Sequence, residues 1–144
     1  MRRLILISML GLACWRGPEV GDEQMQMLSP DGGRLMTFQE LATEVFEPSC
    51  ATSFCHKPDP PPAAPMSMEH AKVYAEIVDV ASSQKPMLKR VAPGDPANSY
   101  VVIKMRASTA AAHGTTRMPL NKPEVAEELI QQVEAWILRG APND

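Results

Sequence analysis

The chain is poor in aromatic residues and has no excess of positive charge. Aromatic residues make up 5% of its 144 residues, so a single domain of this length is short of bulky core side chains. A large planar cofactor could supply the missing bulk, although aliphatic side chains alone support many helical domains. The formal net charge is -3, which gives no support to nucleic-acid binding, because that function favours clustered basic residues.

Long apolar runs and strict two-residue alternation are also missing. Beyond the N-terminus no run reaches the roughly 18 apolar residues of a membrane span, so we expect no internal transmembrane helix. No stretch alternates apolar and polar residues in the manner of a half-buried strand, and no segment repeats. These absences predict an all-α domain with long loops between its helices.

The N-terminus has the features of an export signal. Arg2 and Arg3 precede the apolar stretch 4–13, which is too short to span a bilayer stably, and Cys14 follows it. The sequence Leu-Gly-Leu-Ala-Cys at 10–14 resembles a bacterial lipoprotein signal, in which the cysteine is lipidated and becomes the first mature residue. A plain secretion signal cleaved nearby is the alternative. Either reading predicts export, to the periplasmic side of a bacterial membrane or to the cell surface.

The segment after Cys14 is rich in turn-forming residues and lacks apolar periodicity. We therefore expect a signal peptide at 1–13, a tether at 14–35 and one folded domain at 36–144. Lipid on Cys14 would hold that domain at the membrane.

The first and last helices of the domain have the clearest sequence signals. Thr37 and Glu40 have the capping-box pattern at the start of the first helix, and we expect Pro48 to end or redirect it. The last helix should carry Pro123 in its first turn and have Gly140 as its C-terminal cap.

Two shorter helices are expected between them. Apolar residues at helical spacing predict one helix over 67–80, capped by Ser67, and another over 100–105, capped by Ser99. We expect loops at 81–98 and 107–122, and an extended loop in the proline-rich segment after the first helix.

One short stretch carries recognisable chemistry: Cys50-Ala-Thr-Ser-Phe-Cys55-His56. Two cysteines, the second followed directly by histidine, can attach a haem covalently. The thiols add to its two vinyl groups, and the imidazole is held where it can bind the iron. The usual pattern has two residues between the cysteines, whereas this chain has four. If Cys14 is lipidated, Cys50 and Cys55 remain as a pair, which in an exported protein could instead form a disulfide.

A second axial ligand would have to reach the opposite face of such a ring from a loop. Met118 lies in the loop 107–122, and Pro119 restricts its backbone. A methionine that only fills the core remains an alternative for Met118. Other candidate ligands stay open, namely Met66, Met68, Met87, Met105, His113 and His70.

Other interpretations of the polar residues also remain. Zinc held by Cys50, Cys55 and His56 would need a further histidine, and adjacent ligands would strain a tetrahedral site. Arg90 or Arg117 could neutralise the carboxylates of a haem, and Tyr100 could hydrogen-bond one of them, although surface arginines and a packed tyrosine are the simpler readings.

Several segments together resemble small bacterial c-type cytochrome domains, of a kind common among exported lipoproteins of myxobacteria and related groups. They are His56, Val91-Ala-Pro-Gly-Asp-Pro-Ala-Asn-Ser-Tyr100, Met118-Pro119 and Trp136-Ile-Leu-Arg-Gly-Ala-Pro142. The resemblance covers about residues 38–142. It implies a class-I cytochrome c-like fold, all-α, with crossing first and last helices and long haem-wrapping loops. It also implies one covalent haem c per chain, with Cys50 and Cys55 as thioether donors, His56 as the proximal ligand and Met118 as the distal ligand.

The function expected on these grounds is electron transfer by a membrane-tethered monohaem cytochrome with redox-protein partners and no enzymatic activity. Two alternatives stay open. One is a haem-free structural or binding lipoprotein that keeps the cytochrome-like fold and forms a Cys50–Cys55 disulfide. The other is a haem with one open face that binds a gas or a peroxide.

Overall fold

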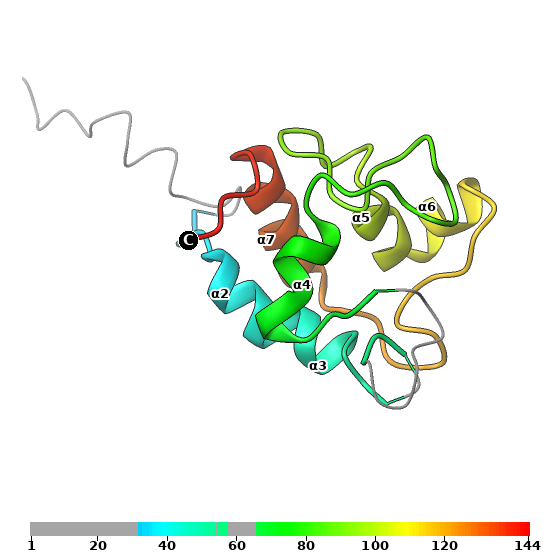
Figure 1. Cartoon of the computed structure of the whole chain (residues 1–144), viewed down its shortest axis with the longest axis horizontal. Coiled ribbons are helices and arrows are strands. Elements are labelled where there is room, and N and C mark those ends of the chain that lie inside the picture. Colours follow the sequence, from blue (N-terminus) through cyan, green and yellow to red (C-terminus); the bar gives the residue numbers. More distant parts are fainter. Residues whose placement is uncertain (1–31, 54, 58–65) are drawn as a thin grey trace, which may run out of the picture.

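The computed structural model describes residues 32–53, 55–57 and 66–144, whose path Figure 1 traces. Within these ranges the chain forms helices and three isolated bridges but no strand of a sheet. None of the helices in this part of the chain has the length and apolar character needed to cross a membrane. The expected signal peptide with Cys14 and most of the tether lie outside the described residues. The helical elements are α2 (Phe38–Leu41), the π-helical η1 (Ala42–Phe46), α3 (Glu47–Ser49), α4 (His70–Ile77), α5 (Tyr100–Met105), α6 (Ala107–Ala112) and α7 (Glu127–Leu138).

The elements α2, η1 and α3 follow one another without a break and form one helical run. Its start is the predicted capping box, in which Thr37 accepts from the Glu40 amide and the Glu40 carboxylate accepts from the Thr37 amide. Pro48 lies inside the run and does not end it. A proline has no N–H, and its ring crowds the preceding turn of an α-helix. Here the preceding turn is the wider π-helical turn of η1, so the helical run continues through Pro48.

The two middle helices differ from expectation at their ends. The helix Tyr100–Met105 is confirmed, but Ser99 does not cap it with its side chain; its hydroxyl donates to the Asp95 carbonyl and closes the preceding turn. Helix α4 (His70–Ile77) has its N-cap at Glu69, two residues after the expected cap at Ser67, and it ends at Ile77, before the expected end at 80. It buries Val73 and Ile77, whereas Ala71, which the same helical spacing places among the apolar residues of this segment, is exposed.

Helix α6 was not expected, because the segment 107–122 lacks a periodic apolar stripe. Its residues are alanine-rich, and alanine has the highest intrinsic helix propensity. Helix α7 starts at Glu127 and not near Pro123. The residues before it are held to the preceding loop, because Arg117 donates to the Lys122 carbonyl and its Nε lies 3.3 Å from Glu124.

The C-terminus of α7 is capped as predicted. Gly140 has a φ of 95°, in the left-handed region that favours glycine. Its N–H bonds to the Ile137 carbonyl, and the Ala141 N–H bonds to the Trp136 carbonyl, which together make a Schellman motif.

The first helical run packs against α7 through aromatic side chains. The ring of Phe38 lies 5.5 Å from that of Trp136, measured between centroids, and 4.9 Å from that of Tyr74. Phe46, at the other end of the run, also contacts Trp136. Three of the chain's few aromatic side chains, Phe38, Phe46 and Trp136, therefore form the centre of the core, and the partly buried Tyr74 packs against it. The crossing angle of a class-I cytochrome fold stays a prediction.

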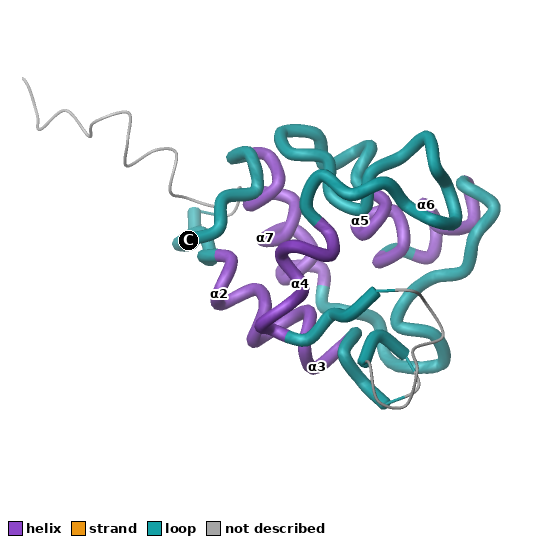
Figure 2. The backbone as a smooth tube through the Cα atoms, in the orientation of Figure 1, coloured by secondary structure: helices purple, strands orange, loops and turns teal. Residues whose placement is uncertain are grey.

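On the side of the molecule away from α2 and the C-terminus, long loops surround α5 and α6 (Figure 2). The longest joins α4 to α5 and is organised by three isolated bridges, Val78–Val91, Ala81–Lys89 and Lys89–Ser99. This loop, the cysteine stretch after α3 and the loop between α6 and α7 supply most of the walls of the site described next.

Candidate functional site

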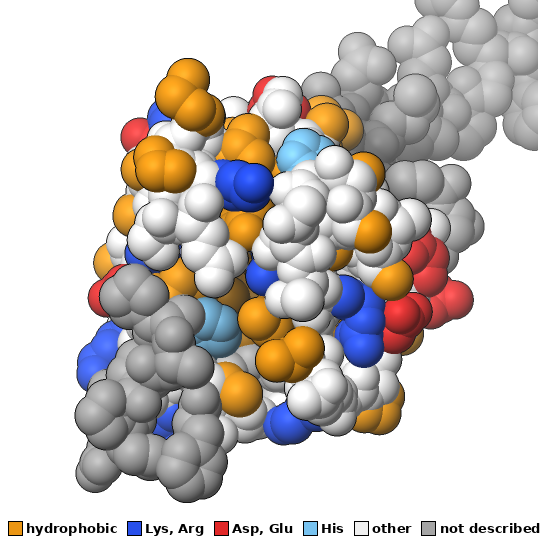
Figure 3. Space-filling view, turned by 90° about the vertical axis from the view of Figure 1, so that its right-hand side faces the viewer, with side chains coloured by type: hydrophobic (Ala, Val, Ile, Leu, Met, Phe, Trp, Pro, Cys, Tyr) orange, Lys and Arg blue, Asp and Glu red, His pale blue; other side chains and the backbone are white. Residues whose placement is uncertain are grey.

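A cavity of about 290 Å³ lies among these loops, and most of its lining is apolar. Figure 3 shows a hollow on this side of the molecule, with hydrophobic, histidine and basic side chains around it. The lining includes Cys50, Cys55, His56 and Met118. The structure therefore brings together all four residues predicted for the site in the folded domain, whereas Cys14 lies outside the described residues.

The cysteine stretch folds back onto the end of α3. The Cys50 N–H still bonds to the helical carbonyl of Phe46 at 2.9 Å, and the His56 N–H bonds to the Cys50 carbonyl at 3.2 Å. A further bond at 2.9 Å runs from the Cys55 N–H to the Thr52 carbonyl. These backbone bonds bring the end of the stretch back next to Cys50 despite the four intervening residues, and both cysteines line one cavity.

Both thiols of this stretch are free. Burial raises the pKa of Cys50 to about 12, the neighbouring Cys55 adds to the shift, and Lys122 opposes it. Cys50 is therefore a neutral thiol at neutral pH, since the charged thiolate is disfavoured inside a mostly apolar wall.

His56 has a half-buried ring with an unused nitrogen. Its Nδ1 is buried and has no hydrogen-bond partner among the described residues. Burial lowers the pKa of His56 because the imidazolium loses hydration; the Met66 carbonyl opposes this shift, and Arg90 adds to it. The ring is thus neutral at neutral pH, the form in which imidazole binds metals.

Met118 lies in the loop between α6 and α7 and is half-buried at the cavity wall. Its N–H donates to the Lys104 carbonyl at 2.7 Å, which ties the loop to α5. Three of the alternative methionines, Met66, Met68 and Met105, also line the cavity. The fourth does not, because Met87 is 96% exposed.

The alternative histidine ligands do not line this cavity. His113 is exposed after α6. His70 is also exposed, and its Nε2 lies 2.7 Å from the amide oxygen of Gln39. Within the described part of the chain, no three or more His, Cys, Asp or Glu side chains form a group arranged to hold a metal ion.

The charged side chains among the described lining residues of the cavity are all basic. Arg90, Lys104 and Lys122 are among the lining residues, and no Asp or Glu is found among the described ones. Arg117, the other expected arginine, is absent from the wall and is held by Glu124 and the Lys122 carbonyl.

Sequence reasoning missed Lys104 as a site residue. A lysine in a short helix is usually a surface residue, yet this one is only 8% exposed, and burial lowers its pKa. The available signal was its spacing: Lys104 follows Tyr100 by one helical turn and so shares its face.

The lining residues fit a haem in their chemistry. Two free thiols, a neutral imidazole with an unpartnered nitrogen and a thioether meet at an apolar cavity, and these are the groups that attach and ligate a c-type haem.

Comparisons with protein-family models, with curated proteins and with solved structures found no match to this chain.

Proposed function

We propose that the protein is an electron carrier, a monohaem c-type cytochrome tethered to a bacterial membrane by lipid on Cys14. One observation carries the proposal. Cys50, Cys55, His56 and Met118, which come from two separate loops, line a single cavity with mostly apolar walls. Apolar walls favour the burial of a large ring and exclude water from it.

In this proposal each of the four residues has a distinct task. Cys50 and Cys55 would fasten the group through thioethers, and His56 and Met118 would be its two axial ligands. When bound, the haem would supply one-electron chemistry between its ferrous and ferric states. A methionine ligand is associated with a high reduction potential.

The longer spacing between the cysteines is compatible with this arrangement. The hydrogen bond from His56 N–H to Cys50 O closes the stretch at its two ends. The additional residues therefore leave His56 next to the end of α3, and the Met68 N–H bonds to the His56 carbonyl at 2.8 Å and fixes that position further.

The polypeptide itself would make and break no substrate bonds. Its side chains would bind, orient and shield the haem and offer a surface to redox-protein partners outside the cytoplasm. With two axial ligands from the chain, no coordination position would be open to a gas or a peroxide.

The test is direct. The full chain is expressed with cytochrome c maturation in an exporting bacterium, and we expect a c-type pyridine haemochrome spectrum and a mass increase of one haem. The Cys50→Ser, Cys55→Ser double variant is the control and should lose both signals. The Cys14→Ser variant should keep the haem but leave the membrane fraction.

The competing function predicts a different mass spectrum. If the native protein carries an intact Cys50–Cys55 disulfide and no haem, under conditions that mature a control cytochrome, the electron-carrier proposal is wrong. The protein would then be a haem-free structural or binding lipoprotein.

A further inference from the structure

A chain of polar side chains lies where the mostly apolar cavity meets a second, more polar groove. The Lys104 Nζ donates to the Thr115 hydroxyl at 2.9 Å, and that hydroxyl lies 3.2 Å from the Tyr100 hydroxyl. Tyr100 in turn donates to the amide oxygen of Gln84 at 2.8 Å. Gln84, Tyr100 and Lys104 line both the cavity and the groove.

Lys104 is a buried cation with no acidic partner among the described residues. Its residue is 8% exposed, and none of the ion pairs among the described residues includes it. Thr115 takes one of its three N–H donors, and the ring of Tyr100 lies 5.8 Å away. Buried charges in proteins are normally paired, because the lost hydration must be replaced.

The surroundings favour an anion at this point. The described residues that line the cavity and the groove include no Asp or Glu, whereas Lys85 stands in the groove and Arg90 in the cavity. The apolar cavity wall continues from Lys104, so a bound group can have an apolar body with its negative charge at one end.

We propose that Lys104, Tyr100 and Thr115 form a carboxylate-binding site at the junction of the cavity and the groove. A carboxylate has one negative charge to match the single ammonium, and two oxygens to accept from the ammonium and from a hydroxyl. It can come from a group held in the cavity, which under the proposed function is a haem carboxylate, or from a solute that enters through the groove. The first source rests on the proposed function and the second does not.

The first arm of the experiment uses the full-length, haem-loaded protein. Resonance Raman spectra report the bending bands of the haem carboxylates, which respond to hydrogen bonding. We expect these bands to shift in Lys104→Met and in Tyr100→Phe, and to stay in place in Lys104→Arg. Lys72→Met is the matched control, because it removes the same charge on α4 from a residue outside the cavity lining.

The second arm uses the same protein with sodium acetate as the probe. Thermal unfolding is compared in acetate and in chloride at equal ionic strength. If the site binds a carboxylate from solution, acetate should raise the midpoint temperature of the parent protein until the site is saturated. This rise should be lost in Lys104→Met and kept in Lys72→Met. If a haem carboxylate already occupies the site, acetate has no such effect.

The two arms separate this proposal from the proposed function. A haem-free protein that is stabilised by acetate through Lys104 would contradict the electron-carrier function and support the carboxylate site. A haem-loaded protein whose Raman bands ignore both Lys104→Met and Tyr100→Phe, and which does not respond to acetate, would overturn the carboxylate site and leave the electron-carrier function standing.

Discussion

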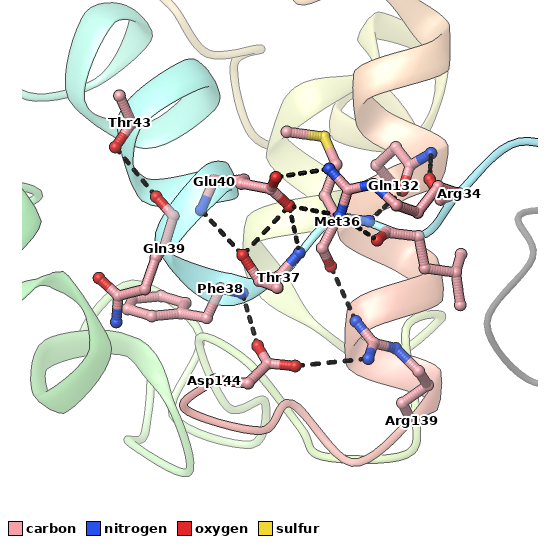
Figure 4. Close-up of polar contacts among 11 residues, drawn as sticks. Arg34, Met36, Thr37, Phe38, Gln39, Glu40, Thr43, Gln132, Arg139 and Asp144 are labelled. Carbon is pink, nitrogen blue, oxygen red and sulfur yellow. Dashed lines mark hydrogen bonds and ion pairs between the residues drawn. The ribbon is translucent and has the colours of Figure 1, made fainter.

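The carboxylate of Asp144 accepts a hydrogen bond from the backbone N–H of Phe38 at 2.7 Å, so a residue beyond α7 caps the first turn of α2 (Figure 4). The Asp144 carbonyl accepts from the next amide, that of Gln39. Arg139 adds a bond to the Met36 carbonyl and lies 3.5 Å from the Asp144 carboxylate. The first and last described segments thus stabilise each other through bonds that do not involve the cavity.

Replacing Asp144 with alanine should therefore destabilise the domain without disturbing the site. Loss of a helix-capping acceptor typically costs about 1 kcal/mol in the free energy of unfolding. Urea unfolding at neutral pH measures this cost. The matched variant Asp144→Asn keeps an acceptor oxygen and should lose clearly less; equal losses in the two variants would contradict the capping role.

The neighbouring carboxyl of Glu40 should make the stability of the protein depend on pH in the acid range. The hydrogen bonds from Arg34 and from the Thr37 amide lower the pKa of Glu40 from 4.5 to about 2. A carboxyl with a lower pKa in the folded state contributes stability above the unfolded value, and that contribution disappears as the pH falls through the folded value. The parent protein should thus lose its advantage over Glu40→Gln between about pH 4.5 and pH 2, which melting curves over that range can check. A constant difference across the range would contradict this.

Apolar spacing predicted most of the helices and missed the places where a side chain outside the helix decides where it begins. Phe38, Leu41, Ala42 and Val45 recur in the sequence at the spacing of one helix face, and all four are fully or almost fully buried. The predicted start of α7 was wrong because Arg117, earlier in the same loop, holds Lys122 and Glu124 outside the helix. A pattern within one segment contains no information about such a partner.

The sequence predicted the candidate site about as completely as it predicted the helices. Motif spacing selected Cys50, Cys55 and His56, and the position of Met118 before a proline selected that residue from many methionines. Spacing could not show that three further methionines share the cavity. Spacing places Lys104 on the same helix face as Tyr100, but it could not show that Lys104 is buried and bonded to Thr115, which comes from a separate loop.

The raised pKa of Cys50 predicts slow alkylation wherever haem is absent. Since the pKa rises from 9.0 to about 12, the thiolate fraction at mildly alkaline pH should fall by about a thousandfold. Iodoacetamide should therefore modify Cys50 in reduced, haem-free folded protein far more slowly than in the same chain in denaturant, as measured by peptide mass spectrometry. Equal rates in the two states would show that Cys50 is not buried as described. In haem-loaded protein neither cysteine should react.

The assignment of Met118 as an axial ligand can be tested against the other methionines of the cavity. In haem-loaded protein, Met118→Ala should abolish the methionine–iron charge-transfer band and lower the reduction potential by on the order of 0.1 V or more, because axial ligands set haem potentials over about 0.8 V. Visible spectroscopy and a redox titration measure both effects.

The chain supplies two kinds of control for this experiment. Met87→Ala changes a methionine that is 96% exposed and should leave the band and the potential as they are. Met66→Ala, Met68→Ala and Met105→Ala change methionines of the cavity wall and should keep the band, although Met68 and Met105 are buried and their loss should lower stability. If the band survives in Met118→Ala and disappears in one of these three, the ligand is that methionine, and the loop between α6 and α7 only covers the site.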